Sequence, residues 1–247
     1  MGDFILIDGS EGEGGGQMLR SALALSLLTR KPFRAVNIRA NRPKPGLAAQ
    51  HLASVHAAAS VGHAVVTGDQ RGSREVTFEP GTVQSGQFEF RIETAGATAL
   101  VLHTVYLPLI LRGQGTSSLR IMGGTHVKAA PNFEFLDKVW RSYVGRLGAA
   151  LTLTLVRKGL YPRGGGEIRV TIEPARRLMA LADLGTVDPH SADQLLLPLA
   201  FAEGASRYPT SAVTQHLLTN AVVIQRFVNR TIRITGTVGA AGLIEID

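Results

Sequence analysis

The sequence DGSEGEGGGQMLR, residues 8–20, is the stretch around which we expect the fold to be organised. It lies between an apolar run that predicts a buried strand and a second apolar run that predicts a helix. Glycines expose backbone N–H groups, and the start of a helix adds positive partial charge, so such a turn can bind an anion. With Arg20 on phosphate oxygens and Glu11 or Glu13 on a divalent cation, the turn suits a phosphate-rich ligand. The alternative is that the glycines only permit a tight turn, and their spacing matches neither the Rossmann nor the Walker motif.

The composition indicates a globular chain without thiol chemistry. The chain has 247 residues, of which 45% are hydrophobic, and it has no cysteine. That apolar fraction is enough for a sizeable core, and the absence of cysteine excludes disulfides and thiolate metal sites. The net charge of +7 is carried mainly by arginine and favours a polyanionic partner such as nucleic acid or a nucleotide. A basic surface without a partner is the alternative.

The apolar segments do not predict a membrane protein. The most apolar helix candidate, residues 98–111, is too short to span a bilayer and contains His103. The first residues, Met1 to Asp3, lack the basic start of a signal peptide. We therefore expect a soluble, cytoplasmic protein with no membrane partner.

A pattern of strand, helix, strand, helix, strand, strand occurs three times, over about residues 1–82, 83–174 and 175–247. Such an internal repeat determines the architecture more firmly than one motif does. It predicts an α/β fold in which three units, each a small sheet with helices on one side, pack around a shared helical core as one body. The helix candidates at residues 17–29 and 98–111 are apolar nearly all round, as buried helices are.

The elements of the first two units are clearly marked, whereas the third unit begins weakly. Expected strands of the first two units are 4–8, 33–39, 64–68, 75–79, 87–93, 118–122, 150–156 and 166–173, and expected helices are 17–29, 46–61, 98–111 and 132–147. In the third unit we expect a poorly formed opening near 178–184, helices at 192–201 and 213–228, an extended piece around 207–208, and strands at 231–237 and 242–246.

A basic loop precedes the second helix of the first unit. Arg39, Arg42 and Lys44 lie within six residues, and prolines beside them stiffen the loop at a helix entrance. Such a loop suits a triphosphate or an RNA backbone. A solvated loop without a function is the alternative.

His216 is a candidate nucleophile. It lies at the start of the corresponding helix of the third unit, where the helix N-terminus disfavours a positive charge and keeps the imidazole neutral. Asp193 is expected in the first turn of the preceding helix, either stabilised by the helix dipole or orienting His216 or a ribose. The other histidines show no metal-ligand spacing, and no serine lies in a GxSxG elbow, so neither a zinc site nor a serine hydrolase is expected.

Five motifs lie at residues 8–20, 38–47, 161–166, 192–195 and 216–220. In their order, and over nearly the whole chain, they resemble the motifs of the RNA 3'-terminal phosphate cyclases. The resemblance implies the three-unit fold that these cyclases share with enolpyruvyl transferases. It also implies an enzyme that uses ATP and Mg²⁺ or Mn²⁺ and acts on RNA with a 3'-phosphate end.

The chemistry implied by this resemblance uses a covalent histidine-AMP intermediate. AMP then passes to the RNA 3'-phosphate, and the neighbouring 2'-hydroxyl closes a 2',3'-cyclic phosphate. By position, His216 resembles the adenylated nucleophile and Glu13 the metal ligand. The residues that the resemblance implies for ATP or phosphate binding are Arg20, Arg39, Arg42, Lys44, Gln50, His103, Pro131, His190, Asp193 and Gln194.

The sequence departs from the family pattern at three places. The small domain that family members usually insert is absent between residues 174 and 192, and the short connector omits a helix. His190 and His103 replace an expected tyrosine and glutamine near the nucleotide. Two alternatives therefore stay open: a non-catalytic RNA-binding or assembly protein, and adenylation of another phosphate end. Short edge strands also allow a homodimer.

Overall fold

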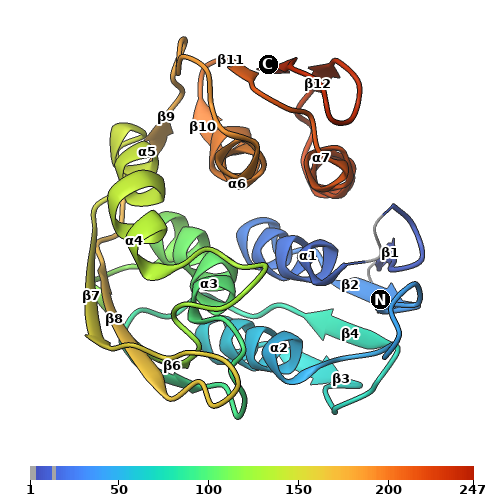
Figure 1. The fold of residues 1–247 in the computed structure, drawn as a ribbon, viewed down its shortest axis with the longest axis vertical. Coiled ribbons are helices and arrows are strands. Elements are labelled where there is room, and N and C mark those ends of the chain that lie inside the picture. Colours follow the sequence, from blue (N-terminus) through green and yellow to red (C-terminus); the bar gives the residue numbers. More distant parts are fainter. Residues whose placement is uncertain (1–3, 13–14) are drawn as a thin grey trace.

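Three main β-sheets lie around a group of helices in the computed structural model, which describes residues 4–12 and 15–247 (Figure 1). The sheets form the outside of the molecule on three sides, and α1, α2, α3, α6 and α7 lie between them. This arrangement confirms the α/β fold class of repeated units around a shared helical core.

The first unit has the expected element order. Its elements are β1 (Ile5–Asp8), α1 (Gly16–Thr29), β2 (Phe33–Val36), α2 (Ala49–Gly62), β3 (Val65–Thr67) and β4 (Val76–Glu79). The strand order is β1-β2-β4-β3, in which β1 and β2 are parallel and the other pairs are antiparallel.

The second unit repeats this topology. Its elements are β5 (Gln87–Arg91), α3 (Thr98–Arg112), β6 (Ser117–Gly123), α4 (Phe133–Phe135), the π-helix η1 (Leu136–Trp140), α5 (Arg141–Arg146), β7 (Leu151–Arg157) and β8 (Gly166–Ile172). The order β5-β6-β8-β7 has the same directions as the first sheet. The continuous helix expected at 132–147 is interrupted by η1, whose wider turn buries both Leu136 and Trp140.

The third unit departs from the pattern at its start. Its elements are β9 (Leu178–Met179), α6 (Pro189–Ala200), β10 (Ala202–Glu203), β11 (Ser206–Thr210), α7 (Gln215–Phe227), β12 (Ile232–Thr235) and β13 (Gly242–Ile246). β9 pairs with β10 and is not part of the β11-β13-β12 sheet. The place of a first strand beside β11 is taken by Val187, which forms a single parallel bridge to Thr210. The poorly formed opening expected near 178–184 is confirmed, because only Leu178–Met179 of that range is a strand, and this strand pairs with β10 instead of joining the main sheet.

Two helices begin three residues away from the expected position. α2 begins at Ala49, not residue 46, because Gly46 has φ +81° and a Cβ there would meet the carbonyl oxygen of Gly72. α6 begins at Pro189, not residue 192, because Asp188 caps it by accepting bonds of 3.0 Å from the N–H groups of His190 and Ser191.

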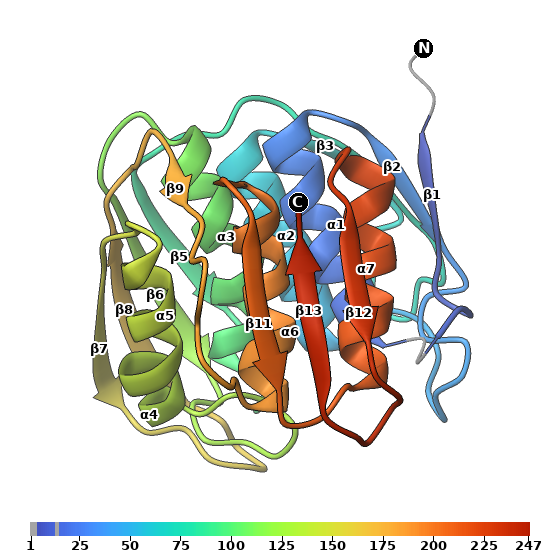
Figure 2. The ribbon, with the colours of Figure 1, turned by 90° about the horizontal axis from the view of Figure 1, so that it is seen from above.

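The core joins the three units. α1 contacts α2, α3 and α7, and α6 contacts α7. Figure 2 shows β11, β13 and β12 covering α6 and α7. The side chains of Leu23, Leu25 and Leu102 are fully buried, as expected for helices that are apolar nearly all round. No helix within residues 4–12 and 15–247 has the length and apolar character needed to cross a bilayer.

Candidate functional site

A cavity of about 540 Å³ opens where the helices of all three units meet. α1, α3, α6 and α7 contribute side chains to it, and the segment from Ala129 to Trp140 closes one wall. Its lining residues are Gln17, Arg20, Ser21, Leu100, His103, Tyr106, Ala129, Ala130, Pro131, Asn132, Phe135, Trp140, His190, Asp193, Gln194, Leu197, His216 and Asn220.

A hydrogen-bonded network on one side of the cavity joins α1, α6 and α7. The Gln17 amide Nε2 donates to both carboxylate oxygens of Asp193 at 2.6 Å. Asn220 Nδ2 donates to Asp193 Oδ1 at 3.1 Å, while Asn220 Oδ1 accepts a bond of 2.6 Å from the Ser21 hydroxyl. Side chains from the first and third units are thereby held in one arrangement.

Asp193 is not the helix-terminal residue that we expected. Because Asp188 and Pro189 start α6 earlier, Asp193 lies in the second turn and is only 9% exposed. Burial raises the pKa of its carboxyl, and the hydrogen bond from Gln17 and the charge of His216 oppose this rise. Packing between helices, rather than a helix dipole, therefore determines its environment.

His216 is the second residue of α7 and follows the capping residue Thr214 by two positions; the Thr214 hydroxyl accepts a bond of 3.0 Å from the Leu217 N–H. A Cβ built on Gly15 would lie 3.8 Å from both His216 Cε1 and an Arg42 guanidinium nitrogen. The glycine at the start of α1, the histidine at the start of α7 and the basic loop therefore meet at one place. Both helix N-termini contribute positive partial charge there.

Two further basic side chains lie next to this place. Burial lowers the pKa of Arg20 to about 10, and Asp193 partly offsets the effect. Burial, with the charges of Arg20 and Arg39, lowers the pKa of His51 to about 3. His51 Nδ1 accepts a bond of 3.2 Å from the Ala48 N–H, so the neutral ring carries its proton on Nε2. Arg20 therefore makes this end of the site cationic, and the neutral His51 adds an N–H donor, so phosphate groups are attracted there.

The other end of the cavity is aromatic and has unused hydrogen-bonding atoms. The centroid of the Trp140 ring lies 4.9 Å from the centroid of the His103 ring and 4.8 Å from that of the Tyr106 ring. Within the described part of the chain, His103 Nε2, Trp140 Nε1 and Gln194 Oε1 are buried without a hydrogen-bond partner. Burial lowers the pKa of His103 to about 3, so its ring is neutral. A flat ligand with hydrogen-bonding edges suits these groups.

The residues expected in the site are distributed between the cavity and its edge. Arg20, His103, Pro131, His190, Asp193, Gln194 and His216 all line the cavity. Arg42 reaches Gly15, whereas the Arg39 guanidinium donates to the Gly46 carbonyl at 3.0 Å beside His51. Lys44 is exposed on the loop, and Gln50 packs against Gly96 instead of lining the cavity. Glu13 lies outside the described residues.

Several cavity residues were not expected from the sequence, namely Ser21, Tyr106, Trp140 and Asn220. Helical spacing offered a signal for most of them, since Ser21, Tyr106 and Asn220 lie one turn after Gln17, His103 and His216. Trp140 depends on the π-helix, which the sequence pattern did not indicate.

The described residues contain no group of three or more histidine, aspartate or glutamate side chains that could hold a metal ion. A magnesium ion that accompanies a triphosphate takes most of its ligands from phosphate and water, and it needs only one or two carboxylates. The described donors therefore do not form a metal cage of their own.

The fold and cavity define a class of α/β proteins in which three similar units enclose a pocket suited to a phosphorylated, aromatic ligand. The family model for the RNA 3'-terminal phosphate cyclases matches residues 11–234. The chain therefore belongs to the RNA 3'-terminal phosphate cyclase family, as its five motifs predicted.

Individual relatives agree with this assignment. The chain is 42% identical over 212 residues to the RNA 3'-terminal phosphate cyclase of Salmonella enteritidis, covering 85% of this chain and 62% of the relative. It is 50% identical over 175 residues to the cyclase of Caldivirga maquilingensis, covering 71% of this chain and 49% of that protein. The chain thus spans only part of the length of the relatives it matches.

Among solved structures, the enolpyruvyl transferase NikO from Streptomyces tendae has a similar fold. The TM-score is 0.51 at 13% sequence identity, and the match covers 97% of this chain and 47% of that one. At this identity the similarity concerns the fold alone, and it agrees with the expected relation between the two families.

Proposed function

We propose that this chain converts an RNA 3'-terminal phosphate to a 2',3'-cyclic phosphate, using ATP, through a histidine-AMP intermediate. The observation that carries the proposal is the position of His216, which lines one cavity together with Arg20 and the buried Asp193. Membership of the cyclase family supports the same reaction.

In the first step, an imidazole nitrogen of His216 attacks the α-phosphorus of ATP. A nitrogen–phosphorus bond forms, the bond from the α-phosphorus to the bridging oxygen breaks, and pyrophosphate leaves. Arg20, Arg42 and the N–H groups at the start of α1 lie where they would stabilise negative charge on the phosphates. His216 lies at the start of α7, where an imidazole nitrogen can serve as the nucleophile.

In the later steps, an oxygen of the RNA 3'-phosphate attacks the phosphorus of the bound AMP and releases His216. The 2'-hydroxyl of the same ribose then attacks the 3'-phosphorus, loses its proton and expels AMP, which leaves a cyclic phosphodiester. Asp193 contacts Gln17 and Asn220 rather than solvent, so we assign it to positioning and charge balance around His216.

The aromatic end of the cavity would hold the adenine. The rings of Pro131 and His190 line the cavity and could pack against a base. Trp140, His103 and Gln194 supply polar atoms that have no hydrogen-bond partner in the described residues. A divalent cation would be held mainly by the phosphates, with Glu13 as its protein ligand, and would supply charge neutralisation of the leaving pyrophosphate.

The test is a cyclisation assay with a labelled oligoribonucleotide that ends in a 3'-phosphate, with ATP and magnesium. ATP-dependent conversion of the 3'-phosphate to an end that resists phosphatase would support the proposal. An oligonucleotide with a 3'-hydroxyl is the control. If AMP is transferred instead to 5'-phosphate ends, the acceptor in the proposal is wrong. If RNA binds without any ATP-dependent change, the chain is a binding protein and the proposal fails.

A further inference from the structure

The loop between β7 and β8 exposes an aromatic side chain among cations. Tyr161 is 81% exposed and the neighbouring Leu160 is 58% exposed. Lys158 and Arg163 on either side are exposed as well. The cavity and the steps proposed above do not use this loop, although its sequence from Tyr161 onward is one of the five motifs.

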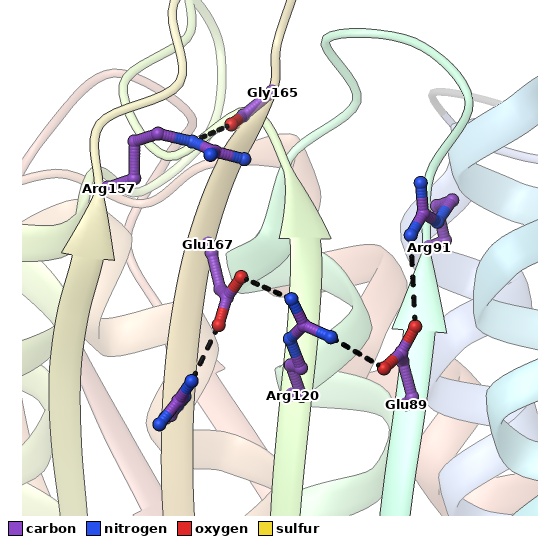
Figure 3. Close-up of polar contacts among 7 residues, drawn as sticks. Glu89, Arg91, Arg120, Arg157, Gly165 and Glu167 are labelled. Carbon is purple, nitrogen blue, oxygen red and sulfur yellow. Dashed lines mark hydrogen bonds and ion pairs between the residues drawn. The ribbon is translucent and has the colours of Figure 1, made fainter.

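The base of this loop is held firmly, so the exposure of Tyr161 does not come from a loosely attached segment. The Gly159 carbonyl accepts bonds of 2.9 and 3.1 Å from the N–H groups of Thr125 and His126, and the Gly159 N–H donates to Thr125 Oγ1 at 2.9 Å. Arg157 Nε donates to the Gly165 carbonyl at 2.6 Å across the loop (Figure 3). A Cβ on Gly159 would lie only 2.3 Å from the Gly123 carbonyl, so only glycine fits this junction.

The same contacts connect the loop to a wall of the cavity. Thr125 and His126 begin the segment that continues into the cavity residues Ala129 to Asn132. His126 Nε2 lies 2.6 Å from a carboxylate oxygen of Glu134 on α4, and Lys158 Nζ lies 3.9 Å from the other. In Figure 2 the loop lies at the lower edge of the molecule, as do the first turns of α6 and α7.

The cations of the loop differ from those on the adjacent sheet face. There, Arg120 contacts Glu89 and Glu167 at 2.9 Å each, and Arg169 contacts Glu167 at 3.2 Å, so these arginines are neutralised within the sheet (Figure 3). Arg163 pairs with no carboxylate in the described part of the chain, and it remains available to an outside anion. The loop, rather than the sheet face, is therefore the better surface for phosphates.

We propose that this loop binds the single-stranded RNA immediately preceding the 3'-phosphate, with a base stacked on Tyr161 and phosphates near Lys158 and Arg163. An exposed aromatic ring beside basic side chains suits single-stranded nucleic acid, because a splayed base offers its flat face and the backbone offers charge. Of the two cations, Arg163 has no carboxylate partner in the described residues, and Lys158 has only the 3.9 Å contact with Glu134. The inference rests on the proposed function, since it assigns a surface to the RNA that enters the same cavity.

The experiment measures binding of a fluorescent single-stranded oligoribonucleotide of about ten nucleotides, a length within the usual site sizes, carrying a 3'-phosphate. Tyr161→Ala should weaken binding by about tenfold, within the range expected for loss of one stacked base, whereas Tyr161→Phe should bind like the parent. Met179→Ala, which removes a 48% exposed side chain on β9, is the matched control and should change nothing.

Salt dependence and labelling by ATP give independent readouts. The paired substitution Lys158→Ala and Arg163→Ala should lower the slope of log affinity against log salt by about one to two. Transfer of labelled AMP to the protein should be unchanged in Tyr161→Ala. If Tyr161→Ala binds RNA as the parent does, this inference is wrong but the proposed function stands. The same holds if Tyr161→Ala loses RNA binding and AMP transfer to an equal extent. Failure of the parent both to bind RNA and to take up AMP would overturn both.

Discussion

Asp193 holds three helices together through its carboxylate. It accepts hydrogen bonds from Gln17 on α1 and Asn220 on α7 while it lies on α6. A buried acceptor with two amide donors is stabilising only while every member of the network is paired. The Asp193 carboxylate therefore explains why Gln17, Asp193 and Asn220, which belong to three separate motifs, occur together.

Replacing Asp193 by Asn should destabilise the protein. The new amide would turn an N–H group toward the donors of Gln17 or Asn220 and leave a buried donor unpaired, at a cost of about 1–3 kcal/mol in the free energy of unfolding. Urea denaturation measures this change, with the exposed Asp183→Asn as the control. Equal stability of parent and Asp193→Asn would contradict the network.

His51 should make the protein less stable as the pH falls. Its pKa is about 3 in the folded protein and near the ordinary 6.5 in the unfolded chain, so the unfolded state binds more protons between these values. From pH 7 to pH 5 this histidine alone should remove about 1–2 kcal/mol from the free energy of unfolding.

The substitution His51→Asn tests this dependence, because an amide oxygen can still accept the Ala48 N–H. The variant should lose less stability between pH 7 and pH 5 than the parent, and the exposed His63→Asn is the control. The remaining decrease is expected in part from His103, whose pKa burial also lowers to about 3. An unchanged decrease in His51→Asn would show that His51 is not responsible.

At the scale of secondary structure elements, η1 shapes the aromatic end of the cavity. Its wide turn places Trp140 against His103 and Tyr106 of α3. π-Helical turns are uncommon and occur frequently at functional sites. The unpartnered indole N–H within the described chain is then available to a ligand.

Trp140→Phe removes this N–H while it keeps an aromatic ring. If the indole donates to the base, the Kd for ATP should rise about threefold to tenfold, as expected for one hydrogen bond, and the Kd for inorganic triphosphate should not change. Equilibrium binding of both ligands provides the comparison. A parallel weakening of both would indicate general damage, and no effect on ATP would show that the indole does not read the base.

The basic loop before α2 depends on a glycine that no other residue can replace. Gly46 and Gly72 have φ +81° and +83°, but only at Gly46 would a Cβ meet backbone, 2.2 Å from the Gly72 carbonyl oxygen. Gly46→Ala should therefore lower the free energy of unfolding by at least about 1 kcal/mol more than Gly72→Ala does, because Gly72→Ala introduces only the strain of a positive φ. Thermal and urea unfolding of the two variants measure the difference, and equal losses would contradict it.

At the scale of the whole molecule, the repeat was visible in the sequence because each unit alternates apolar strands with fully apolar helices. Leu23 and Leu102 are buried, as that pattern predicts. The weak start of the third unit was expected, but its pairing was not, because a two-residue strand and a single bridge at Val187 leave no alternation to detect. Of the site, the basic and histidine motifs were visible in the sequence. Asp193 was expected in the first turn of its helix, which Asp188 and Pro189 start earlier, and Trp140 was missed because its position depends on the π-helix η1.

The three units build one cavity, in which we propose that His216 is the nucleophile. The most direct test incubates the protein with magnesium and ATP labelled on the α-phosphate, and compares the parent with His216→Ala and with the exposed His63→Asn. We predict acid-labile AMP on the parent and on His63→Asn, and none on His216→Ala. A folded parent that takes up no AMP, or a His216→Ala variant that is labelled like the parent, would contradict this proposal.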